Sequence, residues 1–266
     1  MSMSISGKTA IVTGGANGIG LAIGRHFIDQ GANVMFADVD EERLLAELGA
    51  NREEGSIRYF AGDLREKLTL ANLLSATIAA FDEVDILVNA ARRVVVSDAL
   101  NPDDDAVQKL LDVNLMPALR LSQLVAKRMI KQAETREEGM AGAIINLSSI
   151  AARRTHPKLM AYSVASAALD QMTRSLAVAL APERIRVNAV AFGSVMSASL
   201  KDALRDDSKC REDIEAHTPL GRIAQPAELA SAVQYLASDA SAFMTGQIMT
   251  IDGGRSLLDS VSVPSH

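Results

Sequence analysis

The sequence predicts an α/β protein in which a doubly wound, seven-stranded parallel sheet is flanked by helices. Short runs of β-branched and apolar residues alternate along the chain with segments whose apolar residues recur three and four positions apart. The runs are almost continuously apolar, as expected of strands buried on both faces. No low-complexity linker interrupts the alternation, so we expect a single domain.

The strands and helices can be assigned in order along the chain. The predicted strands cover residues 9–13, 33–38, 56–60, 85–89, 142–148, 185–190 and 247–252. The predicted helices cover residues 18–30, 41–50, 66–80, 104–131 and 158–180. Strands separated by helices pair in parallel, because each crossover helix covers one face of the sheet.

Two segments depart from this alternation. Residues 197–226 are charged and weakly periodic and end at a proline, which is typical of a lid-like segment over a site. A solvated surface excursion is the alternative interpretation. Residues 256–266 form a short, mostly polar tail that we expect to be frayed. We therefore predict one domain over residues 1–266 that carries these two additions.

Composition and charge exclude several classes of protein. Apolar residues make up 48% of the chain and charged residues 23%, which is ordinary for a globular protein. The formal charge is −6 and the basic residues are scattered, so we expect no nucleic-acid partner. No apolar run approaches the length of a membrane span, and four widely separated histidines predict no metal site.

The cysteine content and the first residues indicate a compartment. Cys210 is the only cysteine, so no internal disulfide is possible, which fits a reducing environment. The N-terminal stretch MSMSISGK lacks an apolar core of signal-peptide length. We therefore expect a cytoplasmic protein without a membrane partner.

The stretch TGGANGIG, residues 13–20, lies between the first predicted strand and the first predicted helix. Gly14, Gly18 and Gly20 permit a tight turn and let backbone N–H groups approach a pyrophosphate. Asp38 ends the second strand, where a carboxylate binds the ribose hydroxyls of adenosine. Its charge would repel a 2′-phosphate, so the sequence favours NAD over NADP. A turn former or helix cap is the alternative role of Asp38.

The stretch AYSVASAAL, residues 161–169, raises the question of catalysis. It puts Tyr162 and Ser166 one turn apart on the same face of a predicted helix. An unperturbed phenol has a pKa of about 10, so a tyrosine that acts as an acid or base near neutrality needs a nearby cation. The residue one turn away is instead a neutral serine.

Further motifs occur in a fixed order. GDL at 62–64 resembles an adenine-contacting acid motif, and LDVNL contains Asn114. INLSS ends in Ser149, thirteen residues before Tyr162. RIRVNAV and TGQIMTIDGG follow as two late strands with a glycine-rich end. With TGGANGIG, which is similar to TGxxxGIG, these motifs make the chain resemble the short-chain dehydrogenase/reductase family, classical type, over nearly its whole length.

The resemblance implies a Rossmann-type fold, an NAD cofactor and an alcohol or carbonyl substrate. In the family the tyrosine exchanges a proton with the substrate, the serine holds the substrate oxygen, and the asparagine connects an active-site lysine to a water chain. The residues that match these three catalytic positions are Tyr162, Ser149 and Asn114. The positions that match the cofactor site are Gly14, Asn17, Gly18, Ile19, Gly20, Asp38, Asp63, Leu64, Asn89, Ala91 and Val195.

The resemblance also implies a homotetramer. The helices at 104–131 and 158–180 would pair across a dyad. Small residues allow helices to approach closely, and those that would suit this contact are Ala161, Ala165, Ala168 and Ser175.

Three residues depart from the family's pattern around the nicotinamide half of the cofactor. Ser166 stands where the family has a lysine that assists the tyrosine and binds the nicotinamide ribose. Arg92, in NAAR, replaces a glycine of the family's NNAG, and Phe192 replaces the proline of its PG pair. Ser197 keeps a hydroxyl where the family often has threonine. The matches for the adenine half are intact.

The missing lysine determines the expected activity. An adjacent ammonium lowers the pKa of a tyrosine by on the order of three units, equivalent to roughly 4 kcal/mol or about a thousandfold in rate. We therefore expect an NAD-dependent oxidoreductase that interconverts a secondary alcohol and a ketone slowly. Arg92 should either displace the nicotinamide or reach past it, and Arg92 or Arg93 supplying the missing cation stays open. The alternative function is a non-catalytic NAD-binding protein or an inactive partner subunit.

Overall fold

The computed structural model describes residues 2–49, 55–135, 138–197, 200–201, 204–205 and 208–259. Its centre is a seven-stranded parallel sheet with the order β3-β2-β1-β4-β5-β6-β7. The strands are β1 (Thr9–Thr13), β2 (Asn33–Asp38), β3 (Ile57–Ala61), β4 (Ile86–Asn89), β5 (Gly142–Ser149), β6 (Ile185–Phe192) and β7 (Ile248–Ile251). The predicted α/β fold with a seven-stranded parallel sheet is confirmed.

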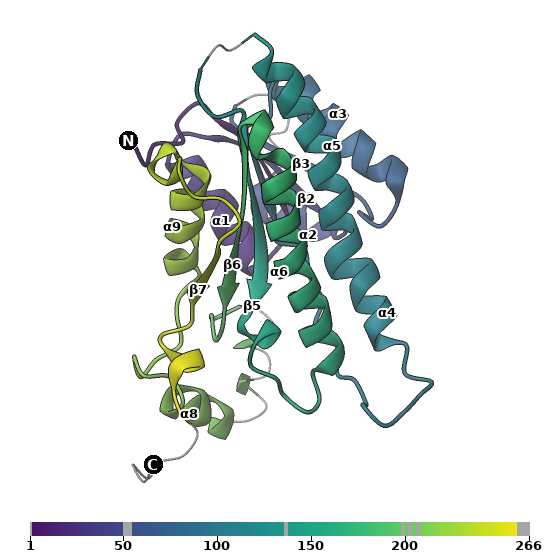
Figure 1. Cartoon of the computed structure of the whole chain (residues 1–266), viewed down its shortest axis with the longest axis vertical. Helices are drawn as coiled ribbons and strands as arrows, with labels where there is room; N and C mark the ends of the chain where they lie inside the picture. The colour runs from purple at the N-terminus through teal and green to yellow at the C-terminus, as the bar shows by residue number, and fades with distance from the viewer. Residues whose placement is uncertain are drawn as a thin grey trace.

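Helices cover both faces of this sheet (Figure 1). α1 (Gly18–Asp29) and α9 (Pro226–Ala237) pack against each other on one face. α3 (Lys67–Phe81), α5 (Met116–Ala133) and α6 (Met160–Leu180) cover the other. The remaining helical segments are α2 (Glu41–Leu48), α4 (Ala106–Leu110), the π-helical turn η1 (Leu111–Leu115), α8 (Ser208–Ala216) and the 3₁₀ turns η2 (Ile150–Ala152), η3 (Ala181–Glu183), η4 (Asp239–Ser241) and η5 (Arg255–Leu257).

The inner strands β1, β4, β5 and β6 are buried on both faces, which explains their continuous apolar sequence, whereas the edge strands β3 and β7 are only partly buried. In β1, Ala10 and Val12 belong to the core beneath α1 and α9. Ile11, between them, belongs to the core beneath α3 and α5. All three residues are fully buried, so a shift of one residue in register would exchange the two sets of side chains.

The chain changes its direction of travel across the sheet at β1. From β1 it adds β2 and β3 on one side, and it then crosses to β4 on the other side of β1. Ligands of open α/β sheets bind outside the carboxyl ends of the strands at such a switch point. The glycine turn after β1 and the segment after β4 therefore meet at one crevice.

α9 is absent from the predicted helices, although its start carries clear signals. Pro226 occupies the first turn of the helix. The backbone N–H of Gln225 donates to the carboxylate of Glu228, with an N···Oε2 distance of 2.9 Å. Both features are typical of a helix N-terminus. The proline that ends the predicted lid-like segment thus also begins a helix that packs on α1.

The helix predicted over residues 104–131 is divided into three elements. α4 is short, the π-helical turn η1 follows it, and α5 continues to Ala133. Asn114 lies within the π-helical turn. Such turns are rare and occur frequently at functional sites. The spacing of apolar residues does not distinguish one π-helical turn from the surrounding α-helix.

Two of the residues predicted to line a helix contact between subunits are placed differently by the structure. Ala161 and Ala165 are completely buried inside the subunit, where they pack with Tyr162 and α4. The prediction is wrong for these two residues because they lie on the inner face of α6. Ala168 is half-buried and Ser175 is exposed.

The two additions to the domain are only partly described. Within 197–226 the structure includes α8, while residues 198–199, 202–203 and 206–207 lie outside the described part, so the lid stays a prediction. In the tail 256–266, residues 260–266 lie outside the described part. Among the described helices, none is long and apolar enough to cross a membrane.

Candidate active site

The glycine turn brings β1, α1 and the segment after β4 into close contact. Gly14 has a φ of +67°, and a Cβ there would lie 2.9 Å from the backbone N and Cα of Ala91. A Cβ on Gly20 would lie 2.1 Å from the carbonyl oxygen of Gly14. Gly18 has a φ of +54°, which also favours glycine. The glycines therefore let the turn pack tightly against the segment after β4 and lead into the N-terminus of α1. We call this turn the glycine cradle, and a pyrophosphate binds at such a helix N-terminus in dinucleotide-binding folds.

Asn17 and Ile19 lie at opposite sides of this cradle. Asn17 is the exposed N-cap residue of α1, and its side chain forms no capping hydrogen bond. Ile19 is 7% exposed and belongs to the core beneath the helix. Asn17 is thus open to solvent at the start of α1, whereas Ile19 anchors the turn.

Asp38 connects the end of β2 to the glycine turn. Its Oδ2 accepts the backbone N–H of Ala16 at 3.0 Å, and its Oδ1 accepts that of Asp40 at 3.1 Å. The N-cap of α2 is Asp40, whose side chain accepts from Arg43, so Asp38 is not the cap of that helix. Its bond to Asp40 gives Asp38 a turn-forming role, and its bond to Ala16 places the carboxylate beside the cradle.

Asp63 and Leu64 follow β3, at the same edge of the sheet. Both Asp63 oxygens accept hydrogen bonds from the Arg65 side chain, with Nε at 3.0 and 2.9 Å. The Arg65 guanidinium lowers the pKa of Asp63, so this carboxylate stays ionised. Leu64 packs against the core beneath α3 and α5. The Asp63 oxygens are already engaged by Arg65, whereas Leu64 supports the segment.

Asn89 and Ala91 carry the chain from β4 into the crevice. Asn89 is buried, and its Nδ2 donates to Asn146 Oδ1 at 2.8 Å and to Ser122 Oγ at 3.1 Å. Thr13 Oγ1 accepts the backbone N–H groups of Ala90, at 3.0 Å, and Ala91, at 3.1 Å. The Asn89 side chain therefore stabilises the sheet, and Thr13, which the sequence analysis does not identify, holds Ala91 against the glycine turn.

Asn114 fixes the next part of the same segment. Its Oδ1 accepts the backbone N–H of Arg93 at 2.7 Å, and its Nδ2 donates to the carbonyl oxygen of Arg93 at 2.8 Å. Asn114 is 8% exposed and lies in the π-helical turn. Its amide thus clamps the backbone that carries the neighbouring Arg92.

Ser149 and Val195 lie at the ends of β5 and β6. Ser149 pairs with Phe192 in the register of the two strands, and its Oγ accepts the backbone N–H of Ala151 at 3.1 Å. Val195 is 3% exposed and forms an isolated bridge with Ala224. Ser149 is therefore placed beside Phe192 at the carboxyl edge of the sheet.

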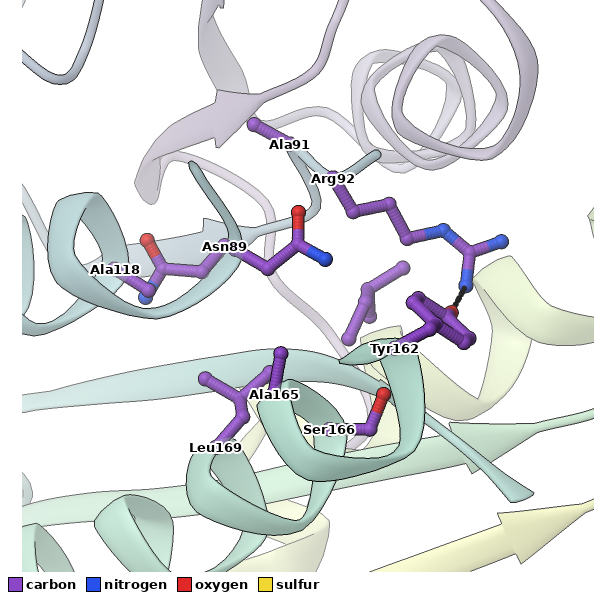
Figure 2. A pocket seen from close by; sticks show the side chains of 10 residues that line it. Asn89, Ala91, Arg92, Ala118, Tyr162, Ala165, Ser166 and Leu169 are labelled. Carbon is purple, nitrogen blue, oxygen red and sulfur yellow. Dashed lines mark hydrogen bonds between the residues drawn. The ribbon is translucent and has the colours of Figure 1, made fainter. Parts of the chain in front are cut away.

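Tyr162 lies in the first turns of α6 and faces a small cavity. Its neighbour Ser166 is one turn further along and is 5% exposed. The structure brings together four predicted site residues and two residues that, from the sequence, we expect to differ from the family's pattern. They line the cavity shown in Figure 2: Asn89, Ala91, Asn114 and Tyr162, with Arg92 and Ser166.

Arg92 points across this cavity to the tyrosine. Its Nη1 donates to Tyr162 Oη at 2.8 Å, as the dashed line in Figure 2 shows. Its Cζ lies 4.2 Å from the centroid of the Phe192 ring, which is a cation–π contact. Arg93 is exposed, so of the two arginines only Arg92 reaches the phenol.

The sequence also does not predict the contact between Arg92 and Phe192. From the resemblance, we expect both residues to differ from the family's residues on the nicotinamide half of the site. That shared location is the only sign in the sequence that relates them, and it does not predict how far apart their side chains lie. Among the described residues, no group of three or more His, Cys, Asp or Glu side chains is arranged to hold a metal ion.

Comparison with known proteins agrees with this architecture. A family profile described as enoyl-(acyl carrier protein) reductase matches residues 14–256. The chain is 33% identical to an L-rhamnose 1-dehydrogenase (NAD(P)(+)) of Sphingomonas, over 94% of this chain and 96% of that protein. It is 33% identical to a 3-oxoacyl-[acyl-carrier-protein] reductase of Thermotoga maritima, over 95% of this chain and 99% of that protein.

Solved structures give the same result. The structure of gox2181 superposes with a TM-score of 0.87 and 32% identity, covering 96% of this chain and 98% of the other. A short-chain type dehydrogenase/reductase from Mycobacterium marinum superposes with a TM-score of 0.81 and 27% identity, covering 96% and 99%. The chain belongs to the short-chain dehydrogenase/reductase family of oxidoreductases.

Proposed function

We propose that this protein is an NAD-dependent oxidoreductase of the cytoplasm that interconverts a secondary alcohol and a ketone. The observation that carries the proposal is the position of Tyr162, whose hydroxyl lies on a cavity shared with Ala91, next to the glycine cradle. The cradle fits a dinucleotide, because it leads directly into the N-terminus of α1, where backbone N–H groups suit a pyrophosphate. When bound, the cofactor supplies or accepts the hydride.

The protein's own residues then bind the substrate oxygen and exchange a proton with it. In the reducing direction Tyr162 Oη gives its proton to the carbonyl oxygen, and in the oxidising direction it takes the proton of the hydroxyl. Ser149 Oγ already accepts the Ala151 N–H, so its own O–H remains to be donated to the same oxygen. Asn114 contributes by holding the segment that lies between the cradle and Tyr162.

The preference for NAD over NADP is assigned to Asp38. Its carboxylate is held at the end of β2 by the Ala16 N–H, where it would bind ribose hydroxyls and repel a 2′-phosphate. Asp38→Asn keeps the size of the side chain and an acceptor but removes the charge. We expect this variant to bind NAD more weakly and to lose much of its discrimination against NADP.

Calorimetric titration of both cofactors into wild type and Asp38→Asn measures this effect. Asp40→Asn serves as the control, because it removes a carboxylate from the same loop that caps α2 instead of contacting the glycine turn. A loss of equal size for the two cofactors in Asp38→Asn would contradict the role of this residue.

Turnover should be slow compared with that of a relative that keeps the lysine. Ser166 is too short and neutral to bind the nicotinamide ribose as the lysine does, and a cation from another element would replace only the charge beside Tyr162. Steady-state rates with NADH or NAD and a panel of ketones and secondary alcohols test the reaction class.

The second candidate is a non-catalytic NAD-binding protein or inactive partner subunit. It is supported by the position of the Arg92 guanidinium on the active-site cavity. Calorimetric binding of NAD without any turnover would favour that second candidate.

A further inference from the structure

The helix that carries Tyr162 offers it no cation. The residue one turn along is Ser166, and the cavity between it and Tyr162 is lined by uncharged side chains on α6. Across the cavity, the cation that reaches the phenol comes from a different element, the segment after β4. This is Arg92, with its Nη1 2.8 Å from Tyr162 Oη.

Arg92 is suited to this contact by its charge. A guanidinium stays protonated at any ordinary pH, so it always donates to the phenol oxygen and cannot take its proton. Arg92 forms no ion pair with a carboxylate in the described part of the chain. No acid among the described residues therefore neutralises its charge, which acts on Tyr162.

Two other contacts fix Arg92 in this position. The Phe192 ring lies beneath the guanidinium, with 4.2 Å from Cζ to the ring centroid. The Asn114 amide clamps the backbone of the next residue, Arg93, with two hydrogen bonds. The three residues expected to differ from the family's pattern therefore act together. Ser166 occupies the position of the lysine without its charge, and Arg92, packed on the Phe192 ring, contacts the same tyrosine hydroxyl.

We propose that Arg92, supported by Phe192, takes over from the missing lysine as the cation that stabilises the ionised form of Tyr162. This inference rests on the proposed function, in which Tyr162 is the acid and base. When the proton moves from Tyr162 Oη to the carbonyl oxygen, the phenolate left behind is paired with Arg92. The bound cofactor would supply the hydride to the carbonyl carbon. Arg92 is then a catalytic residue, and Phe192 is a positioning residue.

The central experiment compares wild type with Arg92→Met, which keeps the length of the side chain and removes the charge. We expect kcat to fall by at least about tenfold, because an adjacent opposite charge shifts an ionisation by about one to three pH units. In the alcohol-oxidising direction the ionised tyrosine is the base, so the rise of kcat with pH should move to higher pH by a similar amount. Arg92→Lys should keep much of the wild-type rate.

The control is Arg25→Met, which removes an exposed arginine of α1 that pairs with Glu47, and its kcat and pH profile should match wild type. A rise in kcat or tighter NAD binding in Arg92→Met would overturn the inference, because the guanidinium would then be an obstacle in the cofactor site.

Two further variants test the arrangement itself. Ser166→Lys restores a cation one turn from Tyr162, so it should recover much of the rate in the Arg92→Met background and add far less to wild type. Phe192→Leu should lower kcat and shift the pH profile in the same direction as Arg92→Met. Added to Arg92→Met, it should change kcat little. The proposed roles would be overturned if Ser166→Lys and Phe192→Leu each changed kcat by the same factor in wild type and in Arg92→Met.

A readout without turnover separates this inference from the proposed function. The tyrosinate absorbance of wild type minus that of Tyr162→Phe reports the ionisation of this one phenol. Arg92→Met should move that absorbance step to higher pH, and an unchanged step would overturn the inference. If no substrate of the panel turns over although NAD binds, the proposed function fails, and the absorbance step still decides the role of Arg92.

Discussion

At the scale of single residues, a buried carboxylate on α6 carries an unfavourable charge. Asp170 lies about two turns beyond Tyr162 and is 4% exposed. Its Oδ1 accepts no hydrogen bond within the described part of the chain. Burial raises the pKa of Asp170, because the charged form loses its water, and the nearby Ser148 hydroxyl and the charges of Arg153 and Arg174 offset this only in part.

The raised pKa gives Asp170 a predictable effect on stability. The folded state binds this proton more tightly than the unfolded state, so the free energy of unfolding falls as pH rises from about 3.8 through the raised value. Asp170→Asn removes the charge, and we expect its unfolding midpoint to exceed that of wild type at neutral pH. The difference should shrink as the pH is lowered toward 4. Thermal unfolding at several pH values checks this, and a less stable variant at pH 7 would contradict it.

Single residues also show which parts of the site are predictable from sequence. Gly14 and Gly20 are needed because a Cβ at either position would clash with nearby backbone atoms, and the local motif TGGANGIG is enough to predict such a tight turn. The conformation of Arg92 depends instead on Tyr162 and Phe192, which are 70 and 100 positions away in the chain. A long side chain in a site can adopt several rotamers, and only the folded partners select one.

At the scale of elements, the start of α9 depends on an ionised Glu228. Its carboxylate accepts the Gln225 N–H and pairs with Arg222 at 2.7 Å. The Arg222 side chain lowers the pKa of Glu228 to about 2. This stabilising effect is therefore present above the unfolded value of 4.5 and is lost as pH falls through about 2.

We expect Glu228→Gln to lower the thermal unfolding midpoint slightly at pH 7, because an exposed pair contributes little. The difference in unfolding midpoint between wild type and Glu228→Gln should become smaller below pH 4.5. Hydrogen exchange should show faster opening of α9 in the variant while α6 is unchanged. A difference in unfolding midpoint that grows in acid would contradict the stabilising role of the ionised Glu228.

At the scale of the whole molecule, one face of α6 is largely exposed among the described residues of the single subunit. Val164, Ala168, Gln171, Ser175 and Val178 follow one another at spacings of four and three, so they form one stripe along the helix. Val164 is 43% and Val178 is 78% exposed. The sequence pattern predicts that α6 pairs with a second subunit but not which face does so, because its alanines occur on both faces.

The exposed stripe of α6 that runs from Val164 to Val178 allows a more specific test of the predicted homotetramer than the buried Ala161 and Ala165. We expect light scattering to give about four times 28.3 kDa for wild type at micromolar concentration. Val178→Glu should lower this mass, because it would bury a charge between helices that approach closely. Leu68→Glu is the matched control: Leu68 is 72% exposed on α3, away from the stripe, and its variant should keep the wild-type mass. A wild-type monomer would contradict the assembly, and a tetramer insensitive to Val178→Glu would place the contact on another face.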